Sequence, residues 1–130
     1  MKTAFLLSLM ISLSASLVFA AEPPPENFDA VRARARQMGE TEEGKVYEKH
    51  FSEALAKPMQ AALRECTKDT KPPYLVNVVF VVGADGTVTR ILWASDQSVS
   101  ACVANKLNGV KLALPPKADW LVSVNIKIEE

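Results

Sequence analysis

The segment Tyr74–Val82, with the sequence YLVNVVFVV, constrains the fold more than any other part of the chain. β-Branched and aromatic residues dominate it, and this is the composition of a strand rather than of a helix. Alternate residues of a strand point to opposite faces, so Val76, Val78, Phe80 and Val82 share one strongly apolar face. We predict a strand that is buried on this face and is covered there by helices.

Two further segments complete a small antiparallel sheet. Gly83–Gly86 ends in an Asp-Gly pair typical of hairpin turns, which predicts that Thr87–Ser95 returns as a second strand. The apolar residues of this strand break strict alternation, and this predicts a β-bulge near Thr89 and Arg90. Trp120–Ile128 alternates apolar and polar residues and is predicted as a third strand, with one sheet face in the core and the other at least partly wet.

A long helix is predicted to end near Cys66, because apolar residues recur before it at spacings of three and four. These residues are Phe51, Ala54, Leu55, Met59, Ala62, Leu63 and Cys66. Pro58 lies inside this pattern, and proline removes a backbone donor and clashes with the preceding turn. We therefore expect a kink or a fresh helix start close to it.

A shorter helix is predicted after Ser95 or Asp96, either of which suits a helix N-cap, and it ends at Asn108-Gly109. The element order is then helix, strand, strand, helix, strand. This order predicts an α+β, two-layer fold: a small three-stranded antiparallel sheet (ββαβ) with helices packed on one face, preceded by an N-terminal helical segment.

Residues 1–20 have the composition of a secretion signal. Lys2 begins it, an uncharged apolar run follows, and Val18-Phe19-Ala20 fits a signal-peptidase site. We predict cleavage after Ala20. Retention as a membrane anchor is the alternative, although the apolar run is shorter than the roughly 20 residues that a bilayer core requires. A cleaved chain is predicted to be periplasmic or secreted.

Residues 21–40 are predicted to be a mobile or loosely docked segment, and residues 41–130 a single domain. Arg32, Arg34 and Arg36 alternate with alanine, so in a helix their side chains point in different directions around the axis and form no single stripe. They indicate either a basic patch for an acidic partner or a solvated helix, and we favour the solvated helix.

The charge balance argues against nucleic acid as a partner. Removal of Lys2 with the signal leaves 14 of the 15 basic residues against 15 acidic ones. Non-specific binding to the phosphates of a nucleic acid needs a clear excess of basic residues, which this chain lacks. No other apolar run reaches membrane-spanning length, so we expect no membrane contact after signal cleavage.

The two cysteines, Cys66 and Cys102, are predicted to form a disulfide. The predicted compartment is oxidising, and each cysteine lies on the apolar stripe of a predicted helix. If both helices pack on the same sheet face, the two thiols can meet between them. The alternative is a pair of buried free thiols.

The sequence contains no recognisable catalytic set. His50 is the one histidine, and with Glu53 it lies in a charged stretch that is explained by a solvated helix face. Ser95, Ser98 and Ser100 form a cluster without the glycines that surround a nucleophile, and helix capping explains it better. There is no phosphate-cradling glycine loop and no metal-ligand spacing. We predict no enzymatic activity and no cofactor.

The region from about Met59 to Ile128 carries a set of features in a recognisable order. They are the Cys66 helix, the strand Val76–Val82, the turn Gly83–Val88, the Ser95 junction, Cys102-Val103 in the short helix, and the closing strand Val122–Ile128. In this order they resemble the C-terminal domain of TonB-type energy transducers, most closely the variant at the C-termini of gliding-motility proteins of the AgmX/PglI type. Leu114 stands where the family has an aromatic residue, and the expected loss of the N-terminal anchor separates this chain from the transducers.

The resemblance implies a domain that binds partner proteins in the periplasm by adding a partner's strand to an exposed sheet edge. Our first hypothesis is therefore a non-enzymatic exported protein-binding module that docks a partner by a sheet edge or an exposed sheet face, with Tyr74 and Trp93 as candidate partner contacts. The alternative is an exported inhibitor or immunity protein that blocks a toxin or hydrolase. A third hypothesis is an enzyme with a different fold.

Overall fold

The computed structural model describes residues 27–94 and 98–129. Its elements, in chain order, are α1 (Phe28–Glu40), α2 (Glu42–Cys66), β1 (Tyr74–Val82), β2 (Val88–Trp93), α3 (Ser98–Leu107) and β3 (Trp120–Ile128). The predicted signal in residues 1–20 and the predicted cap at Ser95 or Asp96 lie outside the described residues.

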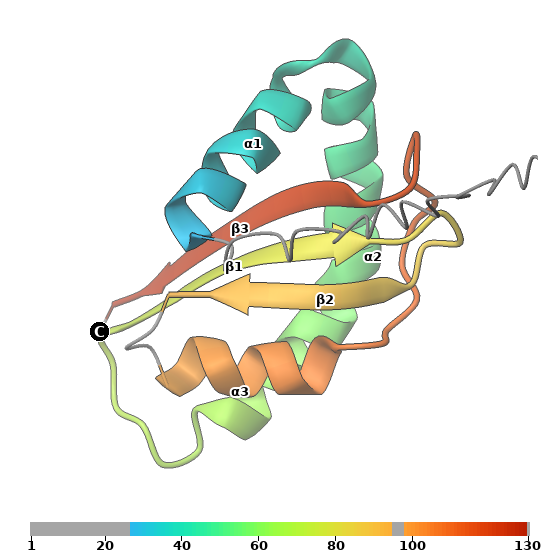
Figure 1. The fold of residues 1–130 in the computed structure, drawn as a ribbon. Coiled ribbons are helices and arrows are strands. Elements are labelled where there is room, and N and C mark those ends of the chain that lie inside the picture. The colour runs from blue at the N-terminus through green and yellow to red at the C-terminus, as the bar shows by residue number, and fades with distance from the viewer. Residues whose placement is uncertain (1–26, 95–97, 130) are drawn as a thin grey trace, which may run out of the picture.

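The three strands form one antiparallel sheet in the order β2-β1-β3 (Figure 1). This confirms the predicted α+β fold with a three-stranded antiparallel sheet, but helices cover both faces of the sheet and not only the one face that was predicted. The predicted bulge is also present: Arg90 lies opposite Val81 and Val88 lies opposite Val82, so Thr89 is the extra residue between them. The central strand β1 pairs with β3 along its whole length, whereas its pairing with β2 stops at Val78.

The main core lies between one face of the sheet and the helices α2 and α3. The four apolar residues predicted to line this face of β1 are all fully buried. From α2, Phe51 packs its ring against Phe80 at a centroid distance of 5.3 Å, and Tyr47 packs edge-on against Trp120 at 6.0 Å. Such tilted aromatic pairs add to the stabilisation that burial alone provides.

α2 runs through Pro58 as one helix of 25 residues, so there is no fresh helix start at the proline. Leu55 and Met59, on either side of Pro58, are both buried in the main core. Packing of this continuous apolar face outweighs the backbone bond that proline removes, because tertiary contacts supply most of a helix's stability in a folded protein.

α1 packs on the opposite face of the sheet from α2 and α3 (Figure 1). Its Val31 and Ala35 are buried against Val79 and Leu121, whose side chains point away from the main core. For residues 28–40 this differs from the mobile or loosely docked segment that was predicted for residues 21–40, and residues 21–26 of that segment lie outside the described residues. Two small apolar residues one turn apart make a narrow stripe, and the alternating arginines obscured it in the sequence.

A tight corner joins α1 to α2 at Thr41. The hydroxyl of Thr41 donates to the carbonyl of Met38 at 2.7 Å and accepts from the N–H of Gly44 at 3.0 Å. A Cβ at Gly44 would collide with the Met38 carbonyl, so glycine permits the close approach of the two helices here. The corner thereby directs α1 across the second face of the sheet.

Candidate functional site

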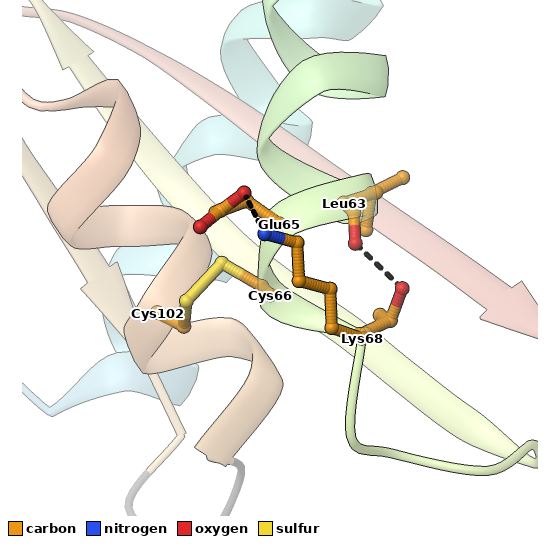
Figure 2. Close-up of a disulfide and its surroundings, with 6 residues drawn as sticks. Leu63, Glu65, Cys66, Lys68 and Cys102 are labelled. Carbon is orange, nitrogen blue, oxygen red and sulfur yellow. Dashed lines mark hydrogen bonds and ion pairs between the residues drawn. A yellow bond between two sulfur atoms is a disulfide. The ribbon is translucent and has the colours of Figure 1, made fainter.

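The predicted disulfide between Cys66 and Cys102 is present and joins the end of α2 to α3 (Figure 2). The two Cα atoms are 5.7 Å apart, and the cysteines are separated by 36 positions in the chain. Both helices pack on the same sheet face, as the prediction required, and this places the two cysteines side by side. The sulfur atoms form a covalent link between two elements that cover β1.

The end of α2 next to the disulfide is held by two polar contacts (Figure 2). The hydroxyl of Thr67 donates to the carbonyl of Leu63 at 2.6 Å, and the Lys68 ammonium lies 2.9 Å from a Glu65 carboxylate oxygen. The hydrogen bond from Lys68, followed by its charge, lowers the pKa of the Glu65 carboxyl. Because the ion pair is exposed, its contribution to stability is small.

Ser100, in the first turns of α3, bonds directly to the backbone of β1. Its hydroxyl accepts a hydrogen bond from the N–H of Asn77 at 3.1 Å and donates to the carbonyl of Leu75 at 3.4 Å. Both groups lie beyond the Val78–Trp93 pair, where β2 has ended. The sequence interpretation of Ser100 as part of a helix-capping cluster missed this contact, because it depends on how α3 docks.

Among the described strands, β3 has the longest outer edge whose backbone groups lack a hydrogen-bond partner, and α1 also packs beside β3 (Figure 1). Asn77 directs its N–H toward Ser100 and therefore away from β3, so its pair with Asn125 is a non-hydrogen-bonded pair. The N–H and C=O of Asn125 then point outward from the sheet, and by alternation so do those of Ser123 and Lys127. Among residues 27–94 and 98–129, no hydrogen bond reaches these outward groups.

Side chains on the second half of β3 complete this edge. Val124, Ile126 and Ile128 are half-buried and lie on the face of the main core, whereas Asn125 and Lys127 are exposed on the other face. A strand added beside β3 would therefore meet a partly exposed apolar row on one face and polar groups on the other. Such an edge suits an extended segment with the same alternation.

The structure does not bring the two predicted partner contacts together. Tyr74 is half-buried at the start of β1 and packs on the main core. It lies opposite Ile128, the last residue of β3. Trp93 is 39% exposed at the end of β2, on the other edge of the sheet, where it borders a cavity of about 150 Å³ beside α3. The outer edge at the start of β2 is already covered, since Val88 bonds to the backbone at Gly109 and Val110.

An exposed apolar hollow was not predicted from the sequence. Val46 is 60% exposed and Leu114 is 68% exposed, and both line a cavity of about 350 Å³ with Tyr47, His50 and the Pro115-Pro116 segment. The signal available in the sequence was that Val46 is a large apolar residue that does not share the buried face of α2. The Tyr47 hydroxyl donates to the carbonyl of Ala113 at 3.0 Å and ties the proline segment to α2.

The candidate catalytic residues do not form a site in the described part of the chain. His50 is exposed in the apolar hollow, Ser98 is exposed at the start of α3, and Ser100 is buried against β1. Across residues 27–94 and 98–129 there is no group of three side chains suited to hold a metal ion. In the same residues, no helix combines the length and apolarity needed to cross a membrane.

Comparisons with protein-family models, with curated proteins and with solved structures found no match for this chain. A functional interpretation therefore depends on the geometry of the two sheet edges and on the sequence resemblance described above.

Proposed function

We propose that this chain is a non-enzymatic exported protein-binding module, with a TonB C-terminal-like fold, that docks a partner by adding the partner's strand to the outer edge of β3. The single observation that carries this proposal is the row of outward backbone groups at Ser123, Asn125 and Lys127, which have no hydrogen-bond partner among the described residues. Main-chain hydrogen bonds along such an edge supply affinity, and alternate side chains supply specificity.

The β3 edge is favoured over the two other docking surfaces. The edge of β2 is covered at Val88 by the chain that follows α3, and it borders α3 further along. The second sheet face, expected to be at least partly wet, is covered by α1 where Val79 and Leu121 lie. Tyr74 lies on the central strand, opposite Ile128 of β3, whereas Trp93 lies on β2 at the other edge of the sheet.

The experiment is photo-crosslinking in the cells that produce the protein. A benzophenone amino acid replaces Lys127, which is exposed on β3, and in a matched control it replaces Lys49, which is exposed on α2. We expect one defined adduct from position 127 and none from position 49. Equal adducts from both positions would contradict docking at the β3 edge.

A second pair of variants tests the backbone itself. Asn125→Pro removes one outward N–H but spares the bonds to β1, because the Asn77–Asn125 pair is not hydrogen-bonded across the ladder. Asn125→Ala changes the side chain and keeps that N–H. We expect the adduct to be lost in Asn125→Pro and retained in Asn125→Ala, with circular dichroism showing that both variants fold. Retention in the folded proline variant would refute strand addition at this edge.

The identity of the captured protein separates the two non-enzymatic hypotheses. If the adduct contains a toxin or hydrolase whose activity falls when the purified chain is added, the inhibitor or immunity hypothesis replaces the general binding module. If the partner's activity is unchanged, the module hypothesis is retained.

A further inference from the structure

β1 contains a short stretch that none of the described strands covers on the side of β2. The last pair between these strands joins Trp93 to Val78, although β1 begins at Tyr74. The N–H of Asn77 and the carbonyl of Leu75 are the groups that a longer β2 would bond. Backbone groups left without partners at a strand edge attract other strands, so natural sheets usually cover them.

α3 covers this gap with one side chain. Ser100 has no exposed surface, and its hydroxyl bonds to Asn77 at 3.1 Å and to Leu75 at 3.4 Å. A serine hydroxyl has one donor and two acceptor lone pairs, so a single side chain satisfies both the N–H and the C=O. Ser100 therefore satisfies the two backbone groups that a longer β2 would bond.

The disulfide lies within one helical turn of this contact, on a different face of α3. Cys102 follows Ser100 by two positions, which is about 3 Å along a helix axis, and it is bonded to Cys66 at the end of α2. Val99 is buried in the main core in the first turn of α3, and Val103, Ala104 and Leu107 are buried there in the rest of the helix. The first turn thus packs in the core through Val99 alone, and the disulfide adds a covalent restraint to it.

We propose that the Cys66–Cys102 disulfide is a redox-sensitive lock on the edge of β1. In the oxidised chain the disulfide holds Ser100 against Leu75 and Asn77. In the reduced chain the first turns of α3 separate from β1, and the two backbone groups become available to water or to an extended peptide. This inference concerns the edge of β1 and is independent of the partner proposed for β3.

The reductant is a dithiol. One of its thiolates attacks a sulfur of the bridge and releases the other cysteine as a thiolate, which takes up a proton. The second thiolate of the reductant then displaces the remaining cysteine and closes a cyclic disulfide. The protein gains two electrons and two protons, and the dithiol loses the same number. In an oxidising compartment the disulfide stays formed and the lock stays closed.

Amide hydrogen exchange, resolved by residue, tests the lock. The full exported chain is measured with and without dithiothreitol, with the Phe80 amide in the three-stranded part of the sheet as the internal reference. Loss of the disulfide destabilises the whole fold and so accelerates exchange at Phe80 through global unfolding. We expect exchange at Asn77 to accelerate at least about tenfold more than at Phe80, because the first turns of α3 also open locally. An unchanged Asn77 rate, or the same acceleration at both amides, would overturn the proposal.

Two serine variants separate the hydroxyl contact from the disulfide. Ser100→Ala keeps the disulfide but removes the bonds to β1, and Ser98→Ala changes an exposed serine of the same helix. In the oxidised state we expect Ser100→Ala to accelerate exchange at Asn77 by about tenfold or more and Ser98→Ala to leave it unchanged. An unchanged exchange rate at Asn77 in Ser100→Ala would show that the Ser100 hydroxyl does not protect this amide, and the proposal would fail.

Discussion

Reduction of the Cys66–Cys102 disulfide is predicted to destabilise the protein by about 4 kcal/mol. The cysteines are separated by 36 positions, and in the chain-entropy model a loop of this length removes roughly 13 cal/mol/K from the unfolded ensemble, which is about 3.8 kcal/mol at 25 °C. A small domain has a total stability of about 5–15 kcal/mol, so the loss is a large share of the whole.

Urea unfolding of the oxidised and the reduced chain measures this loss. With slopes of about 1–3 kcal/mol/M, the midpoint is expected to fall by about 1–4 M on reduction. The Cys66→Ala/Cys102→Ala double variant, measured without reductant, controls for the reagent. A loss below about 1 kcal/mol would refute the reasoning, since it would mean that the disulfide places little constraint on the unfolded chain.

Three further predictions concern packing and ionisation. Gly44→Ala is expected to cost about 1–3 kcal/mol in urea unfolding, because the added methyl collides with the Met38 carbonyl; an unchanged midpoint would contradict this. Val31→Ala should cost about 2 kcal/mol if α1 is firmly packed, and a negligible loss in the same assay would favour a loosely docked helix. Burial raises the pKa of Tyr47 to about 12, from 10.0, so the folded state retains the proton more strongly and stability should fall as the pH rises from about 10 to 12. Tyr47→Phe should lower the free energy of unfolding by about 1 kcal/mol at pH 7, through the lost bond to Ala113. In unfolding experiments at several pH values, this variant should lose less stability than the unmodified protein as the pH rises from about 10 to 12.

Local sequence pattern was sufficient for most of the fold. The bounds predicted for the first and third strands, Tyr74–Val82 and Trp120–Ile128, are those observed. The alternation of their side chains depends only on strand geometry, and the bulge at Thr89 followed from a break in that alternation. The disulfide could be predicted because both cysteines lay on apolar stripes that had to face the same sheet.

Weak local signals account for what the sequence did not predict. The stripe formed by Val31 and Ala35 is only two residues wide and lies among arginines, so its docking was not evident. Pro58 predicted a kink or a fresh helix start, and there is no fresh start because long-range packing keeps α2 one helix. The exposed hollow at Val46 and Leu114 joins positions far apart in the chain, and no local pattern relates them.

The sequence alone thus determined which segments are strands and helices, and which of their faces are apolar, because these properties follow from backbone periodicity within each segment. Only the tertiary structure decided which sheet edges stay open. β2 ends before it covers Asn77, Ser100 closes that gap from another element, and the outward groups around Asn125 are left without a partner among the described residues. Edge exposure depends on how separate elements dock, and hydrogen bonds between distant residues leave no periodic trace in the sequence.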